Sequence, residues 1–153
     1  MAHQYRCMVE WTGAAEGPTA DAQTFSRATR VTFAGRPPVG VSAAPEFGGD
    51  AGQVNPEELF TASLATCQML TYLFLVARNG VRVVGYADEA VGELAVKAGK
   101  LRITRVTLRP TITITADSDR ATAASLVERA HGDCFIANSV ACEVVAEASF
   151  VQG

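Results

Sequence analysis

The sequence predicts an α+β fold in which mainly antiparallel sheets accompany one long apolar helix. Residues 59–77 contain no charged side chain and stand between a helix start and a helix stop. Short segments on both sides of this helix alternate apolar and polar residues, as half-buried strands do. A second, amphipathic helix ends near residue 131 and is followed by one more strand-like segment. Strands joined by hairpins, with the helices set apart from them, are typical of the α+β class.

The first third of the chain predicts strands and a long loop. Residues 5–11 alternate weakly, which indicates an edge strand, and residues 24–33 form a second strand-like segment. Residues 36–40 contain two prolines and a glycine, which break that strand. Residues 41–54 are rich in glycine and lack a clear period, so we expect a loop there.

The long helix has clear end signals. Asn55 can accept a hydrogen bond from the first turn, and Pro56 suits the first helical position, where no donor is needed. The sequence Arg78-Asn79-Gly80 supplies a cation and a left-handed stop. A helix of this length could span a membrane. It also carries threonine, serine, glutamine and tyrosine, so we expect that it is buried inside the protein and not in a membrane.

The remaining segments complete the predicted sheets as part of a single domain over residues 1–153. Residues 81–96 form strands, and residues 101–115 alternate in two phases that change between Ile103 and Val106. Such a change of phase predicts a β-bulge. Pro110 indicates an edge position. The second helix follows Asp117-Ser118-Asp119 and ends at Gly132, and residues 140–151 form the final strand.

Composition excludes several classes of protein. Hydrophobic residues make up 48% and charged residues 19% of the chain, which is typical of a globular protein. The net charge is −3 and the basic residues are scattered, so we expect no binding to nucleic acid or to an anionic membrane. The first residues lack the apolar run of a secretory signal, and we expect a cytoplasmic protein. The four cysteines form no C-x-x-C pair, and we expect no metal.

Two cysteines lie where redox chemistry is possible. Cys67 lies inside the long helix, where most cysteines are simply small core residues. Cys134 follows the Gly132 helix stop, where the backbone is free to move, as a resolving thiol requires. Cleavage of a peroxide needs a thiolate and a donor or cation for the departing charge. Cys67 is too far along the helix to gain from its dipole, so it needs an arginine, which a carboxylate would hold in place.

Two motifs resemble the signatures of the OsmC/Ohr family of organic hydroperoxide reductases. Residues 55–60 read Asn-Pro-Glu-Glu-Leu-Phe, and a cysteine follows ten positions after the first glutamate. Residues 130–139, with Cys134 at their centre, are similar to the second signature, and residues 103–112 are similar to the family's strand after the central helix. The resemblance covers nearly the whole chain. It implies an OsmC-like fold, an intertwined homodimer whose sheets wrap around central helices and whose two sites lie between the subunits.

The resemblance also implies an activity and roles for individual residues. Cys67 would reduce alkyl or lipid hydroperoxides to alcohols, become a sulfenic acid and then form a disulfide with Cys134. An external dithiol such as dihydrolipoamide would reopen the disulfide, with no bound cofactor. Glu57 would orient the catalytic arginine, and Phe60, Met69 and Phe135 would line an apolar substrate pocket.

The family's arginine does not stand at its usual positions. The stretch before the Asn-Pro-Glu motif and the loop over residues 14–22 both lack arginine, which leaves Arg27, Arg30 and Arg36. We favour Arg27, although an ordinary exposed strand arginine is an equal alternative. About 15 Å of straight helix would separate Glu57 from Cys67. The two can share one site only if an arginine spans this gap or the helix breaks, and we expect a break over residues 61–64.

Two other functions stay open at this point. The same fold could hold an apolar ligand without peroxidase chemistry, or it could act as a thiol redox sensor in which Cys67 and Cys134 cycle slowly. Cys7 and Cys142 lie in predicted strands without a signature around them, and we expect both to be bystanders.

Overall fold

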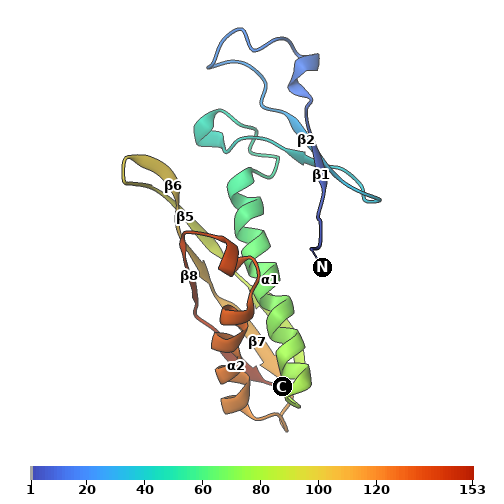
Figure 1. Cartoon of the computed structure of the whole chain (residues 1–153), viewed down its shortest axis with the longest axis vertical. Coiled ribbons are helices and arrows are strands. Elements are labelled where there is room, and N and C mark those ends of the chain that lie inside the picture. Colours follow the sequence, from blue (N-terminus) through green and yellow to red (C-terminus); the bar gives the residue numbers. More distant parts are fainter. Residues whose placement is uncertain (1) are drawn as a thin grey trace. The chain divides into compact units, whose positions relative to one another are not determined.

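The computed structural model describes residues 2–153, and the order of its elements agrees with the α+β prediction (Figure 1). The described chain forms two compact units, one ending at Leu59 and one running from Phe60 to Gly153. The helices and strands are β1 (Cys7–Trp11), β2 (Thr29–Phe33), β3 (Val39–Val41), α1 (Pro56–Arg78), β4 (Val83–Asp88), β5 (Val91–Lys97), β6 (Lys100–Leu108), β7 (Pro110–Ile114), α2 (Arg120–Asp133), β8 (Glu143–Ala146) and β9 (Ser149–Gln152). Three short 3-10 helices are η1 (Gly13–Ala15), η2 (Pro45–Phe47) and η3 (Ala137–Ser139).

The N-terminal unit contains an antiparallel sheet in the order β1-β2-β3. The first predicted strand is confirmed, and β1 is an edge strand of this sheet. The second strand starts later than we predicted, at Thr29, because the backbone N–H groups of Thr24 and Phe25 turn back to the Asp21 carbonyl. The predicted loop over residues 41–54 contains η2 and a single bridge between Val41 and Val54.

Helix α1 begins and ends where the sequence predicts. The Glu58 N–H donates to the Asn55 side chain at 2.8 Å, and the Asn55 N–H donates back to the Glu58 carboxylate at 2.9 Å. This reciprocal pair is a capping box. At the other end Gly80 adopts φ 73°, and the Val81 N–H closes onto the Val76 carbonyl at 3.1 Å.

The predicted break in α1 is wrong. The helix runs without interruption over 23 residues, and residues 61–64 lie inside it. That stretch contains neither proline nor glycine, the usual causes of a kink. Its Ser63 hydroxyl donates to the Phe60 carbonyl at 2.7 Å, and the helix continues past this contact.

Only one face of α1 is buried in the single chain. Its buried residues are spaced three and four apart, as a helix face requires: Leu64, Gln68, Tyr72, Leu75 and Val76. On another face Leu70 and Phe74 are 58% and 59% exposed. By length and composition alone, α1 could cross a membrane, and 28% of its most apolar stretch is buried in the chain. The core helix of a soluble protein can be equally long and apolar. The prediction that the whole helix is buried is therefore confirmed for one side of the helix only.

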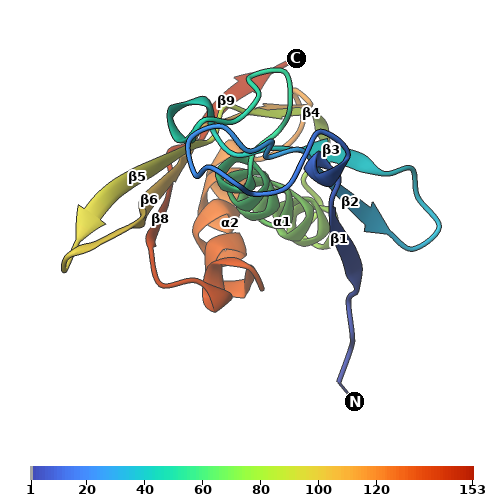
Figure 2. The same cartoon turned by 90° about the horizontal axis from the view of Figure 1, so that it is seen from above.

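Two three-stranded sheets form in the C-terminal unit, in the orders β4-β7-β9 and β5-β6-β8 (Figure 2). The hairpin partners are antiparallel, whereas β8 and β9 join β6 and β7 in parallel. The predicted bulge is confirmed: Glu93 pairs with Arg105 and Leu94 with Ile103, which leaves Thr104 as the extra residue. Pro110 is not in an edge strand as we predicted. It is the first residue of the central strand β7, another position where a missing N–H is tolerated.

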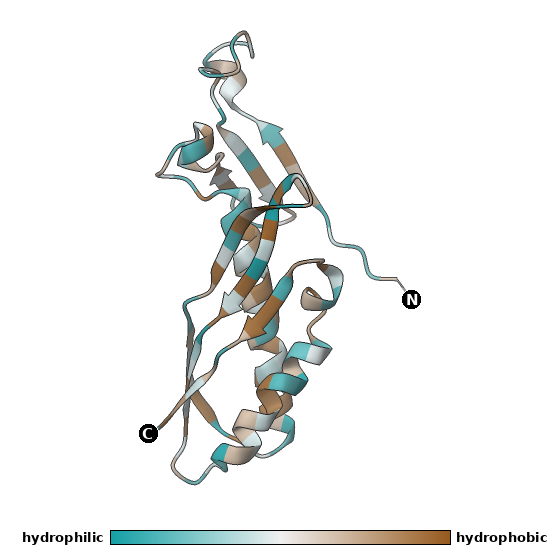
Figure 3. Ribbon diagram, turned by 90° about the vertical axis from the view of Figure 1, so that its left-hand side faces the viewer, coloured by the Kyte–Doolittle hydropathy of each residue, from teal (hydrophilic) through white to brown (hydrophobic). Residues whose placement is uncertain are grey.

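Helix α2 packs its apolar side against α1 and β7. Ala123, Leu126 and Ala130 of α2 share a core cluster with Tyr72 of α1 and Ile112 of β7. Figure 3 shows α2 as alternating hydrophilic and hydrophobic bands, as a one-sided contact requires. The predicted stop at Gly132 is one residue early, because the helix includes Asp133 and is capped by Cys134. A second cluster surrounds Leu64, Val106 and Leu108.

Candidate functional site

Cys67 and Cys134 come together in the C-terminal unit. Cys67 lies on α1 next to the buried Gln68 and is itself partly exposed. Cys134 is the C-terminal cap of α2 and is 1% exposed. The two side chains are in hydrogen-bond contact, and both cysteines are free thiols. Two sulfurs in contact require only a small shift to form a bond.

The turn after α2 is fastened by its own side chains. The Asn138 side-chain amide donates to the Gly132 carbonyl at 2.8 Å, and the Ser139 hydroxyl donates to the Phe135 carbonyl at 2.7 Å. The Asn138 backbone N–H also donates to the Cys134 carbonyl at 3.0 Å. This turn directs the backbone N–H groups of Phe135 and Ile136 at the Cys67 sulfur.

These donors decide the ionisation of Cys67. Burial acts to raise the pKa of the Cys67 thiol, but hydrogen bonds from the Ile136 N–H, the Cys134 thiol and the Phe135 N–H outweigh it, so the pKa lies below its ordinary value. The Thr71 hydroxyl also lies beside the sulfur. Its single proton already serves the Cys67 carbonyl at 2.9 Å, so we assign it the smallest part.

Cys134 shifts in the opposite direction. Burial raises the pKa of the Cys134 thiol, and the neighbouring Cys67 adds to the rise, against hydrogen bonds from the Ala137 and Ile136 N–H groups. A thiol that keeps its proton is the natural donor to a neighbouring thiolate. The pair is therefore polarised, with Cys67 as the sulfur that ionises first and Cys134 as its protonated partner.

Comparison with known proteins places this site in a family. The family model for OsmC-like proteins matches residues 48–149, which include both cysteines. The chain belongs to the OsmC family. Its α+β architecture is the OsmC-like fold.

Several relatives have known structures or sequences. An OsmC-like protein of unknown function from Vibrio cholerae is 34% identical, with a TM-score of 0.90 over 97% of this chain and 100% of that chain. The OhrB organic hydroperoxide resistance protein of Bacillus subtilis shares the fold at a TM-score of 0.65 and 20% identity, over 97% of this chain and 98% of that chain. The uncharacterized protein YmaD of Bacillus subtilis is 25% identical over 103 residues, which is 65% of this chain and 69% of YmaD.

The favoured arginine of this OsmC-like chain is held by carbonyl groups of the N-terminal unit. The Arg27 guanidinium donates to the carbonyls of Ala22 and Phe25 at 2.9 and 3.0 Å, and to that of Gly48 at 3.4 Å. It also stacks over the Phe25 ring, 4.4 Å from its centroid. These contacts give Arg27 a structural role that the sequence pattern did not reveal.

Glu57 lies in the first turn of α1, and Cys67 lies ten residues further along the same helix. Because the helix is continuous, the two positions are separated by about 15 Å of helical rise. Direct contact between the two side chains is excluded by this separation. Within one chain, Glu57 can influence Cys67 only through a third group, as its predicted role of holding an arginine requires.

The three predicted pocket residues have different surroundings in the single chain. Phe60 packs against the core cluster around Leu64. Met69 lines a cavity of about 200 Å³ together with Tyr86 and Asp88. Phe135 is 81% exposed, although its backbone N–H points at Cys67.

The remaining cysteines lie elsewhere. Cys7 is exposed at the start of β1, and Cys142 packs beside the cluster around Leu64. The donors from residues 135 and 136 are what sequence reasoning missed. Every residue except proline carries a backbone N–H, so no residue type marks those that will meet the sulfur. Two sequence signals pointed to this turn: the position of Cys134 directly after a helix stop, and the resemblance of residues 130–139 to the second family signature.

Proposed function

We propose that this protein is a thiol peroxidase that reduces organic hydroperoxides, with Cys67 as the attacking sulfur and Cys134 as the resolving sulfur. The observation that carries the proposal is the polarised contact between the two thiols, in which Cys67 has the lowered pKa and Cys134 the raised one. The fold that the chain shares with organic hydroperoxide resistance proteins supports the same activity.

The chemistry proceeds in three balanced steps. The Cys67 thiolate attacks the terminal oxygen of the hydroperoxide, and an S–O bond forms as the O–O bond breaks, which leaves Cys67 as a sulfenic acid. The departing alkoxide takes a proton from water and leaves as an alcohol. The Cys134 thiol then attacks the Cys67 sulfenic acid, which forms the disulfide and releases water. An external dithiol such as dihydrolipoamide reduces the disulfide by exchange and becomes oxidised itself. In a cytoplasmic location the surrounding thiol pool would keep the pair reduced between turnovers.

In this proposal the N–H groups of Phe135 and Ile136 stabilise the Cys67 thiolate, for which we expected an arginine from the sequence. Preorganised backbone donors stabilise a buried negative charge without the cost of moving a side chain into place. Arg27, oriented by Glu57, remains the proposed guanidinium for the departing alkoxide. To act in that role, it would have to exchange at least one of its carbonyl partners for the substrate.

We expect the working form to be a homodimer. Leu70 and Phe74 lie four residues apart on one face of α1 and are more than half exposed, which is unusual for large apolar side chains in the middle of a long helix. A second copy of the chain would cover this face. Sedimentation velocity tests this: Phe74→Glu should shift the protein from dimer to monomer, whereas Val96→Glu, a matched change of a 71% exposed residue on β5, should not. A wild-type protein that sediments as a monomer would refute the dimer.

Stopped-flow measurement with cumene hydroperoxide tests the enzyme. The reduced protein should consume the hydroperoxide, and Cys67→Ser should abolish consumption while Cys142→Ser leaves it unchanged. Failure of a fully reduced wild-type protein to consume the hydroperoxide would remove the peroxidase and leave a binding protein. The redox-sensor alternative is separated by Cys134→Ser, which in a peroxidase should still give one rapid turnover and a trapped sulfenic acid on Cys67.

A further inference from the structure

Two buried polar side chains of α1 reach across to the backbone of α2. Gln68 and Tyr72 are each 1% exposed, and both lie on the buried face of α1. The Gln68 side-chain amide donates to the Val127 carbonyl at 3.1 Å, and the Tyr72 hydroxyl donates to the Ala123 carbonyl at 3.2 Å. Burial raises the pKa of Tyr72 to about 12, so the hydroxyl keeps the proton that it donates. We refer to these two contacts as the interhelical bonds.

The interhelical bonds define one register of two antiparallel helices. As the position on α1 rises from 68 to 72, the position of the partner on α2 falls from 127 to 123. These steps are about one helical turn, so both bonds join the same two faces. Cys67 directly precedes Gln68, and Cys134 caps the end of α2. A slip of α2 along α1 by one turn, about 5.4 Å, would therefore separate the two sulfurs.

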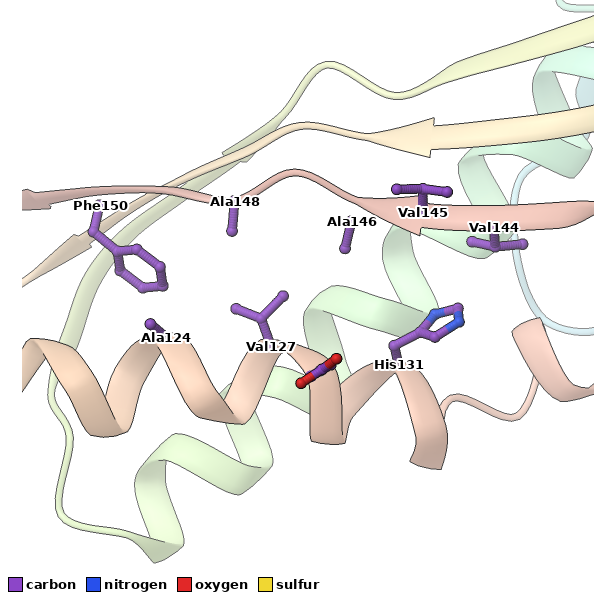
Figure 4. A pocket seen from close by; sticks show the side chains of 9 residues that line it. Ala124, Val127, His131, Val144, Val145, Ala146, Ala148 and Phe150 are labelled. Atoms are coloured by element: carbon purple, nitrogen blue, oxygen red, sulfur yellow. The ribbon is translucent and has the colours of Figure 1, made fainter.

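The apolar contacts of α2 specify this register only weakly. Two of its three buried residues, Ala123 and Ala130, are alanines, and such short side chains interlock little with a facing helix. On another side of α2, Figure 4 shows the side chains of Ala124, Val127 and His131 facing the strand segment of β8 and β9. An open groove of about 470 Å³ lies between these side chains and the strands, so α2 is not tightly packed there either.

Gln68 is an expensive residue to bury at this position. Its Oε1 atom is buried and has no hydrogen-bond partner within residues 2–153. An unpaired buried acceptor destabilises a fold, and a methionine of similar length would avoid this loss. In coiled coils, a single buried polar residue between helices fixes their register at the expense of stability. Gln68 therefore fits a role in aligning the two helices better than a role in stabilising them.

We propose that Gln68 and Tyr72 are positioning residues, whose interhelical bonds hold α2 in the register that keeps the two reactive sulfurs in contact. The inference rests on the proposed function, because it explains how the attacking and the resolving sulfur stay within reach of each other. The same register brings the turn after α2 to Cys67, and with it the N–H groups of Phe135 and Ile136.

The equilibrium between the dithiol and the disulfide form measures this positioning without any hydroperoxide. Protein carrying Cys7→Ser and Cys142→Ser is incubated in mixtures of reduced and oxidised dithiothreitol, and the disulfide fraction is measured by alkylation and mass spectrometry. The disulfide needs the register of this structure, whereas a reduced protein without the interhelical bonds can also populate others. Gln68→Met and Tyr72→Phe should therefore each lower the equilibrium constant for disulfide formation by about two- to tenfold, the range expected for one hydrogen bond.

Unfolding of the reduced protein in urea separates positioning from stability. Gln68→Met removes the unpaired Oε1 atom together with the donor, so its free energy of unfolding should equal or exceed that of the wild type while its disulfide equilibrium constant falls. Ser125→Ala is the matched control, because it removes a hydroxyl that donates at 2.9 Å to a carbonyl within α2 itself. Its equilibrium constant should equal that of the wild type.

The outcomes are distinct. If Gln68→Met does not fold, Tyr72→Phe carries the test, since it removes a single oxygen atom. The proposal is overturned if the equilibrium constant is unchanged in both variants, or if Ser125→Ala lowers it as much as they do. A protein that consumes no hydroperoxide, but whose equilibrium constants fall as expected, would refute the peroxidase and leave the positioning role intact.

Discussion

The hydrogen bond from Cys134 to Cys67 can be tested by two substitutions that differ only in whether they keep the donor. Cys134→Ser retains a hydroxyl that can donate to the Cys67 sulfur, whereas Cys134→Ala removes the donor. Burial has the largest effect on the pKa of the Cys67 thiol and raises it. Among the hydrogen bonds that lower this pKa, the one from Cys134 comes second, after the Ile136 N–H. Loss of the donor should therefore raise that pKa, and the serine variant should stay close to the wild type.

The size of the effect follows from the position of the two side chains. A hydrogen bond to a charged group contributes about 1.5–3 kcal/mol. Cys67 is partly exposed and water can replace part of the lost bond, so we expect about 0.5–1.5 kcal/mol for Cys134→Ala. At a pH well below the pKa this corresponds to about a two- to tenfold smaller thiolate population.

The assay is the rate of Cys67 alkylation by iodoacetamide, measured by mass spectrometry at pH values on both sides of the ordinary cysteine pKa of about 8.5. Cys7→Ser and Cys142→Ser in the background remove the other reactive thiols. The rate should rise at a higher pH in Cys134→Ala than in the wild type. Equal profiles for wild type and Cys134→Ala, or an equal slowing in Cys134→Ser and Cys134→Ala, would show that the donor does not control Cys67.

Three further predictions concern the turn, the core and the second helix. Asn138→Ala removes the side-chain hydrogen bond to the Gly132 carbonyl, so it should slow the alkylation of Cys67. Asn138→Ser retains a hydroxyl and should recover part of the rate. Unchanged rates in both variants would show that this turn does not control the reactivity of Cys67. Leu64→Ala, at a fully buried position, should cost about 2–5 kcal/mol in the free energy of unfolding in urea, and a loss below about 1 kcal/mol would contradict its core position. Hydrogen bonds from Thr122 hold the pKa of Asp119 below its ordinary value of 3.8, so Asp119 stabilises the fold above that pH and loses this contribution as the pH falls through its folded pKa. The melting temperatures of wild type and Asp119→Asn should therefore converge on acidification, and a gap that is constant with pH would exclude this linkage.

The parts of the fold that local chemistry controls could be predicted from the sequence. The Asn55 cap, the Gly80 stop and the bulge at Thr104 each follow from neighbouring residues and were found at or next to the expected positions. The return bond from the Asn55 N–H to the Glu58 carboxylate was not predicted. Pro110 was misplaced because its missing N–H is tolerated in two situations, an edge strand and a first strand residue, and only the sheet order distinguishes them.

Of the candidate site, the two cysteine side chains could be predicted from the sequence, but the backbone N–H donors could not. Cys67 and Cys134 were expected to meet because the resemblance to the OsmC/Ohr family implies it, and their thiols are in contact. The break predicted in α1 came from the assumption that Glu57 and Cys67 must approach each other, and uninterrupted helical hydrogen bonding prevailed over it. The donors of the turn at residues 134–139 arise from long-range packing of α2 beside α1, which no local pattern encodes.

The parallel pairing of β8 and β9 has a consequence for biosynthesis. Each of the two sheets in the C-terminal unit gains its third strand from residues 143–152, after every other strand has already been translated. Until the ribosome has released those residues, β6 and β7 each present an open edge to the surrounding polypeptides. Nascent chains stalled before position 143 should therefore associate with chaperones or aggregate, while chains that extend beyond β9 should become resistant to protease.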